Sequence, residues 1–203
     1  MRSMVLKIKK HKAIILLGKV MMPWLFLLLA IQAALSDGRS SINDEELGLL
    51  FNQLLEIQSS SEADEITLKI WEIWTNDAET EFGQSTMLEG VSLMNRNSLV
   101  AAEELFSELI RSSPDYIEAW NKRATVRYMM GQLENSLNDV YVVLSKEPKH
   151  FGAMSGLGLI MIQREDFEGA LSAYKKLIAI HPFSKDALSL VPILEQRVLG
   201  KSI

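Results

Sequence analysis

The chain has 203 residues, no cysteine, and 26 acidic against 21 basic residues, which gives a formal net charge of −5 at pH 7. The lack of cysteine excludes disulfide bonds and lipid attachment through a thiol. The acidic balance argues against nucleic-acid binding, which needs a basic face that replaces counterions along the phosphate backbone.

Residues 1–36 have the composition of a secretory leader. They carry six basic side chains: Arg2, Lys7, Lys9, Lys10, Lys12 and Lys19. An apolar run from Val20 to Leu35 follows, and no acidic residue precedes Asp37. A basic start, an apolar block and small residues before a cleavage site are typical of a signal peptide. We therefore expect cleavage before Asp37 and an exported, periplasmic protein.

The alternative for residues 1–36 is an anchor that stays in the inner membrane, with the rest of the chain facing the periplasm. The apolar run has 16 residues, fewer than the roughly 20 that span a bilayer. Extending it back through residues 13–18 would bury Lys19, although a lysine near one end can reach the interface. A mitochondrial presequence fits less well, because such segments are amphipathic and rich in Arg and Ser.

Residues 44–82 are expected to form a helical hairpin. Apolar side chains recur at steps of three and four, which indicates helices with one buried face. In 44–57 and 62–75 they are Leu47, Leu50, Phe51, Leu54, Leu55, Ala63, Ile66, Ile70, Ile73 and Trp74. We interpret this pair as an imperfect copy of a repeated unit that begins at residue 83. It would cap the first complete copy, since stacked repeats otherwise expose an apolar face at their ends.

From residue 83 to residue 184 one pattern returns every 34 positions, with prolines at 114, 148 and 182. The other matching sets are Gly90, Ala124 and Gly158; Leu99, Leu133 and Phe167; Ala102, Ser136 and Ala170; Phe106, Val140 and Tyr174; and Leu109, Val143 and Leu177. A constant period of this length indicates stacked copies of one supersecondary unit. We expect three units, at 83–116, 117–150 and 151–184.

Each unit is expected to contain two antiparallel helices. In 117–150 the helical spacing of apolar residues stops near Gly131, which supplies the permissive backbone that a tight turn needs, and then resumes. The small residues at 90, 124 and 158 would allow the two helices to cross closely. The larger residues at 106, 140 and 174 would fill the space beside the crossing.

These residues resemble the tetratricopeptide repeat (TPR) family. The unit at 151–184 matches best, through Met154, Leu157, Gly158, Phe167, Ala170, Tyr174, Leu177 and Pro182. The resemblance implies an all-α fold, namely an α-α solenoid in which antiparallel helix pairs form a right-handed superhelix. It also implies a role in holding a protein or peptide rather than in catalysis, and the chain looks like a small exported bacterial member of that family.

A last amphipathic segment, at 185–203, should cover the final hairpin as a C-terminal capping helix. Its apolar residues are Ala187, Leu188, Val191, Leu194 and Val198. Pro192 lies inside this segment. We expect the helix to kink or restart there, because proline removes one helical hydrogen bond and clashes with the preceding turn.

Arg123 and Arg127 occupy positions where the repeat pattern is apolar. A partly buried guanidinium needs paired hydrogen bonds. We therefore expect a structural ion pair between these arginines and Asp139 on the following helix, with Glu104 and Glu108 of the preceding unit as the next candidates.

No residue pattern indicates catalysis. The three histidines, at 11, 150 and 181, share no metal-type spacing with carboxylates, and His150 and His181 are expected in loops. Gly156 and Gly158 lie within a helix, where glycines serve packing rather than phosphate binding. We expect no catalytic residue, no metal and no cofactor, and hence no enzyme.

A partner is expected on the concave side, which the first helix of each unit lines in such solenoids. The side chains expected in this groove are Met87, Val91, Asn121, Lys122, Thr125, Tyr128, Ser155, Leu159 and Ile162. Asn121 and Lys122 alone match the lysine and asparagine pattern with which the family grips a C-terminal carboxylate. We therefore do not expect that mode of binding.

Acidic side chains are concentrated in residues 44–104, which hold 14 of them against two basic ones. This surface either steers a basic partner or keeps the protein soluble. The leading hypothesis for function is an exported scaffold that binds a protein or peptide of unknown identity. The alternatives are an inner-membrane-anchored subunit of an envelope complex and an accessory or regulatory factor of a partner enzyme.

Overall fold

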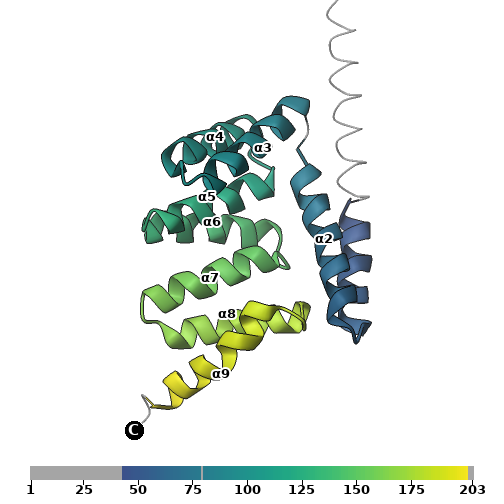
Figure 1. Cartoon of the computed structure of the whole chain (residues 1–203), viewed down its shortest axis with the longest axis vertical. Helices are drawn as coiled ribbons and strands as arrows, with labels where there is room; N and C mark the ends of the chain where they lie inside the picture. Colours follow the sequence, from purple (N-terminus) through teal and green to yellow (C-terminus); the bar gives the residue numbers. More distant parts are fainter. Residues whose placement is uncertain (1–42, 79, 201–203) are drawn as a thin grey trace, which may run out of the picture. The chain divides into compact units, whose positions relative to one another are not determined.

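The computed structural model describes residues 43–78 and 80–200, and the leader expected at 1–36 lies outside them. The described residues from 47 to 200 belong to one compact unit. Within the described residues every regular element is a helix (Figure 1). None of the described helices is long and apolar enough to cross a membrane.

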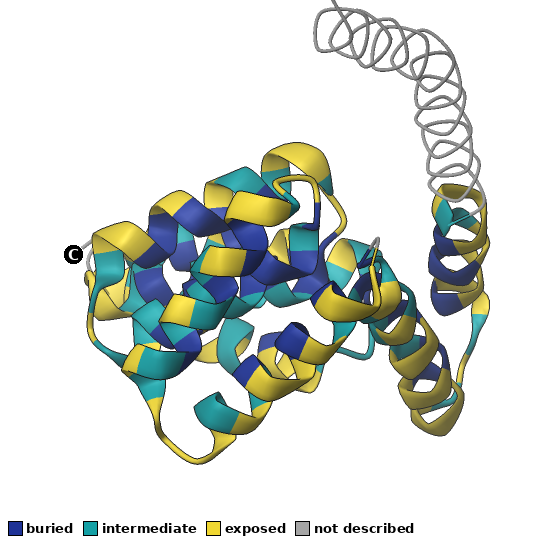
Figure 2. Cartoon of the chain, turned by 90° about the horizontal axis from the view of Figure 1, so that it is seen from above, coloured by how far each residue is buried: buried dark blue, intermediate teal, exposed yellow. Residues whose placement is uncertain are grey.

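Three helical hairpins follow one another along the chain. They pair α3 (Glu81–Asn95) with α4 (Leu99–Ser112), α5 (Ile117–Met129) with α6 (Leu133–Lys146), and α7 (Phe151–Gln163) with α8 (Phe167–Ile180). Because α4 packs on α5 and α6 packs on α7, the hairpins form a stack (Figure 1). Buried residues, dark blue in Figure 2, gather between the packed helices. The prediction of an all-α solenoid is confirmed.

Each hairpin turns at a residue with a left-handed backbone. Asn97, Gly131 and Glu165 have φ angles of 60°, 73° and 59°, and they occupy the same place in the three hairpins. Glycine adopts this conformation freely and asparagine tolerates it, whereas for other residues it costs about 1–2 kcal/mol. Gly131 therefore serves the tight turn that the sequence pattern predicts, and the other two turns keep the same geometry.

The two helices cross closely at a glycine in the first and third hairpins. A Cβ atom at Gly90 would lie 2.6 Å from Cε1 of Phe106, and one at Gly158 would lie 2.6 Å from Cζ of Tyr174. Both rings are fully buried. The missing side chain is therefore what allows each ring to pack against the backbone of the first helix.

An ion cluster joins the second hairpin to the first. Arg123 donates to both carboxylate oxygens of Asp139, at 2.9 and 2.8 Å, and Arg127 donates to Oδ2 of the same carboxylate at 2.8 Å. Arg127 also pairs with Glu103 of α4 at 2.7 Å. The second acid is thus Glu103 rather than Glu104 or Glu108, because those two residues lie on the exposed side of α4.

The N-terminal helices pack at a different place from the one expected. Residues 43–56 are helical, and α2 (Ser60–Asn76) begins after its N-cap Ser59, which accepts a hydrogen bond from the backbone of Glu62. The buried residues from 47 to 74 share one core with α7, α8 and α9.

The first hairpin, which this N-terminal pair was expected to cap, has a core of its own. Among the described residues of 44–82 outside α3, Ala78 alone belongs to that core. The physical reason is aromatic contact: the rings of Phe51 and Trp74 pack against Phe151 at the start of α7. The amphipathic pattern of 44–75 predicts a buried face but does not say which surface covers it.

The last helix, α9 (Lys185–Gly200), packs on α8 and buries Ala187 and Leu194. It contains Pro192 as part of one continuous helix, so the expected restart does not occur. Pro192 is exposed, and water can bond the carbonyl group that a proline leaves without a helical partner. A proline on the solvent side of a helix is therefore tolerated here.

Candidate functional site

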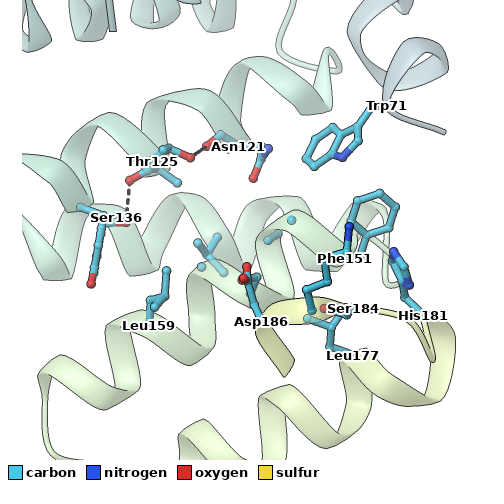
Figure 3. Close-up of a pocket in the computed structure, with 18 of the residues that line it drawn as sticks. Trp71, Asn121, Thr125, Ser136, Phe151, Leu159, Leu177, His181, Ser184 and Asp186 are labelled. Atoms are coloured by element: carbon cyan, nitrogen blue, oxygen red, sulfur yellow. Dashed lines mark hydrogen bonds between the residues drawn. The ribbon is translucent and has the colours of Figure 1, made fainter. Parts of the chain in front are cut away.

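A cavity of about 420 Å³ lies between the first helices of the second and third hairpins, α5 and α7. Its walls also include residues of α2 and the start of α9 (Figure 3). The residues that matter below are Trp71, Asn121, Thr125, Tyr128, Ser136, Phe151, Ser155, Leu159, His181 and Asp186. A volume of this size is typical of sites that hold a small molecule or a short peptide segment, roughly 300–1,000 Å³.

Trp71 of α2 closes one side of the cavity. Its ring meets Phe151 edge-on, with the ring centroids 5.0 Å apart, and it passes close to Gly152. A Cβ atom at Gly152 would lie 2.5 Å from Cη2 of the indole, so glycine is what admits the ring. Nζ of Lys122 lies 5.0 Å from the Trp71 centroid, a distance at which a cation is attracted to the ring face.

The side chains of Glu118 and His150 form a fully buried pair that packs next to Trp71 and Trp74 of α2. The backbone N–H of Ala153 donates to Nδ1 of His150, which makes this nitrogen an acceptor and His150 the N-cap of α7. The ring proton is therefore on Nε2, which donates to Oε2 of Glu118 at 3.1 Å. Trp74 stacks on the ring, with centroids 4.0 Å apart. The pair thus ties the starts of α5 and α7 to α2.

Glu118 stays ionised although it is buried. Burial raises the pKa of this carboxyl, but the hydrogen bond from His150 and the charge of Lys122, whose Nζ lies 2.8 Å from Oε1, together lower it more. The pKa of Glu118 therefore lies below its ordinary value of 4.5. Asn121 donates its amide Nδ2 to the same carboxylate at 3.0 Å, so the charge of Glu118 orients a residue of the cavity wall.

His181 joins the loop before α9 to α2. The hydroxyl of Thr67 donates to the carbonyl of Ala63 at 2.6 Å, so Thr67 accepts from Nε2 of His181 at 3.0 Å. Burial lowers the pKa of His181 below 6.5, which keeps the ring neutral at pH 7. Its Nδ1 is buried and has no hydrogen-bond partner in the part of the chain that the structure describes. Nearby, Lys185 pairs with Asp64 of α2 at 2.9 Å.

Five of the nine residues expected in the groove line this cavity. They are Asn121, Thr125, Tyr128, Ser155 and Leu159. They belong to α5 and α7, and Asn121 is buried while Leu159 is 37% exposed.

The other four residues lie elsewhere. Met87 requires a correction, because it is fully buried in the core of the first hairpin and offers no surface to a partner. Val91 packs partly buried against the same core, and Ile162 packs against the core shared with the N-terminal helices. Lys122 is held by Glu118 and Trp71 beside the cavity.

Sequence reasoning missed the residues that close the cavity. Trp71 and Asp186 belong to segments that were expected to cap the stack, and Phe151 carries no special signal. His150 and His181 lie between helices, as expected, but sequence reasoning did not foresee that both are buried against α2. The one available signal was the pair of tryptophans at 71 and 74, which share a face of α2.

The comparisons with known sequences find relatives but no matching protein-family model. A TPR repeat-containing protein of Rhizobium etli is 31% identical over 161 residues, which cover 79% of this chain and 78% of that protein. The small glutamine-rich tetratricopeptide repeat-containing protein 2 of Saccharomyces cerevisiae is 24% identical over 144 residues. That match covers 70% of this chain and 42% of the yeast protein.

Solved structures of similar fold are TPR domains. The Sgt2 TPR domain from Aspergillus fumigatus has a TM-score of 0.57 and 23% identity, over 61% of this chain and 83% of that one. The first TPR of Spaghetti (RPAP3), bound to the HSP90 peptide SRMEEVD, has a TM-score of 0.56 and 13% identity, over 58% and 93%. At these identities the similarity concerns the fold.

Proposed function

Because the chain belongs to the tetratricopeptide repeat family, we propose that it binds a short segment of another protein in the cavity between α2, α5, α7 and α9. A domain of the same fold, that of RPAP3, was solved with a peptide bound. Stacked helix pairs offer an inner surface that suits such ligands. The proposed role is that of a non-enzymatic scaffold.

The observation that carries the proposal is the cavity itself. The apolar side chain of Leu159 and the partly exposed ring of Tyr128 lie beside the polar groups of Asn121 and Thr125. Apolar surface with a few directed polar groups is characteristic of binding sites. Because α2 occupies part of the inner side, the room left suits a few residues rather than a long extended peptide.

The double variant Tyr128→Ala/Leu159→Ala is expected to bind at least tenfold more weakly to peptides selected on the wild-type protein, since both side chains leave the cavity wall. The peptides come from a phage library of random 12-residue sequences panned on the full chain, and fluorescence polarisation measures their affinity. The midpoint of thermal unfolding should change little, because neither side chain is fully buried.

The matched control is Tyr141→Ala/Leu188→Ala, which removes a tyrosine and a leucine that are about half exposed and lie outside the cavity. This control should bind like the wild-type protein. If both double variants bound the selected peptides equally well, the binding surface would lie elsewhere and the proposal would fail.

Export is the second part of the proposal. It is supported by the basic and apolar composition of residues 1–36. N-terminal sequencing of the protein recovered from cell fractions tests it. A chain that starts at Asp37 in the periplasm supports the soluble scaffold, and an intact chain in the inner membrane supports the anchored subunit. An intact chain in the cytoplasm would contradict both.

A further inference from the structure

Three polar residues of the cavity wall donate hydrogen bonds to other groups of the protein. The hydroxyl of Thr125 donates to the carbonyl of Asn121 at 3.0 Å, and the hydroxyl of Ser136 donates to the carbonyl of Ala124 at 2.7 Å (Figure 3). The amide nitrogen of Asn121 is committed to Glu118. The hydroxyls of Thr125 and Ser136 therefore have only an oxygen left for a ligand, whereas Asn121 keeps its amide oxygen and one N–H.

The charged side chains at the cavity also favour a ligand that carries hydrogen-bond donors. Lys122 is paired with Glu118 and Lys185 with Asp64, so both lysines already have an acidic partner. Asp186, in the first turn of α9, has no cationic partner among the residues that the structure describes, and Figure 3 shows its side chain on the cavity side of α9. The unpaired charge at this wall is therefore negative.

The negative charge of Asp186 also acts on the hydroxyl group of Tyr174 in α8. Burial, and in addition the charge of Asp186, raise the pKa of Tyr174 to about 12. His181 also lines the cavity, and its buried Nδ1 has no hydrogen-bond partner among the described residues. A ligand that fills this space must bring hydrogen-bond donors if the oxygen acceptors of the wall are to be satisfied.

The apolar part of the wall fits an aliphatic chain. Leu159, Tyr128 and Phe151 supply carbon surface, and long basic side chains bury their methylene groups on such surfaces while the charged end keeps polar contacts. The ring of Trp71 already makes a cation–π contact with the ammonium group of Lys122. The site thus combines the two environments that a basic side chain needs.

We propose that the cavity takes a lysine or arginine side chain of the partner segment, with its methylene groups against Leu159 and Tyr128 and its charged end directed to Asp186 and the oxygen of Asn121. This inference rests on the function proposed above and names the chemistry of the partner. A C-terminal carboxylate fits this wall less well than a cation, because its negative charge would lie beside Asp186 and most of the polar atoms that it would meet are acceptors.

The test uses the peptides selected on the full chain from the random 12-residue library. Lysine and arginine should be enriched at one position, and changing that residue to glutamine should weaken binding about tenfold, as measured by fluorescence polarisation. The protein variant Asp186→Asn should lose a similar factor, and raising the salt concentration should weaken the wild-type complex. Glu195→Gln, on the same helix but outside the cavity, should bind like the wild-type protein.

The outcomes separate this inference from the proposed function. Peptides that need Tyr128 and Leu159 but show no basic preference, or that are indifferent to Asp186→Asn, would overturn the inference and leave the proposed function standing. Selected peptides that depend on a C-terminal carboxylate would overturn it as well. If no selected peptide depended on Tyr128 and Leu159, both would fail.

Discussion

Replacing Asp139 with asparagine is expected to lower the free energy of unfolding by about 3 kcal/mol, because the loss of one member of a buried ion cluster leaves the other charges uncompensated. The side chains of Arg123 and Arg127 are only 13% and 18% exposed, so water cannot replace the lost carboxylate charge. Glu103 still pairs with Arg127, which limits the loss. Urea unfolding followed by circular dichroism measures the change.

Glu134→Gln is the matched control for this experiment. Glu134 pairs with Arg164 at 3.6 Å, and the glutamate side chain is 74% exposed. Exposed ion pairs contribute roughly 0–1 kcal/mol, so the control should unfold almost like the wild-type protein. An Asp139→Asn variant that kept full stability but no longer bound the selected peptides would show that the cluster serves binding and not the fold.

Replacing Gly158 with alanine is expected to lower the free energy of unfolding by about 2–3 kcal/mol, because an added methyl group overpacks the crossing of α7 and α8. The new Cβ atom would lie 2.6 Å from Cζ of Tyr174, whose ring is fully buried, so the ring or the helix would have to shift. Urea unfolding again measures the change.

Gly48→Ala provides the opposite case with the same chemical change. Gly48 lies in the helix at 43–56, and nothing lies within 4 Å of the position that its Cβ atom would take. Alanine in a helix is favoured over glycine by roughly 0.8–1 kcal/mol, so this variant should be more stable than the wild-type protein. If Gly158→Ala were stabilised like Gly48→Ala, the close crossing would not be needed.

The repeating hairpins could be predicted because every unit packs its two helices with small and large residues at the same spacing. Gly90 and Phe106 lie 16 residues apart, as do Gly158 and Tyr174, and each pair meets at the crossing of one hairpin. The ion cluster was predictable for a related reason: two arginines at apolar positions require an acid on a neighbouring helix, and Asp139 was the nearest available. The choice of Glu103 over Glu104 depended on the rotation of α4.

The placement of α2 could not be predicted, because a helical pattern reports a buried face without naming its partner. The contacts that decide it come from residues far apart in the sequence, such as Trp74 with His150 and Thr67 with His181. Glu118 and His150 lie in different predicted units, so their pairing carried no local signal. For the same reason the sequence indicated an open groove where the structure has a smaller cavity.

Met87 shows that an equivalent position in the repeat does not by itself place a side chain in the binding groove. It occupies a first helix like Asn121 and Ser155, which line the cavity. In the first hairpin, however, Met87 packs into a separate core with residues of α4 and α5. Position in the repeat therefore predicts a lining residue only where neighbouring hairpins leave space.

The most direct test of the proposed binding site is a crystal structure of the full chain with the tightest peptide from the library. We expect peptide side chains to occupy the space between α5 and α7 and to contact Tyr128, Leu159 and Trp71. A peptide seated on the outer helices, α4, α6 or α8, with the cavity left unfilled, would contradict the account.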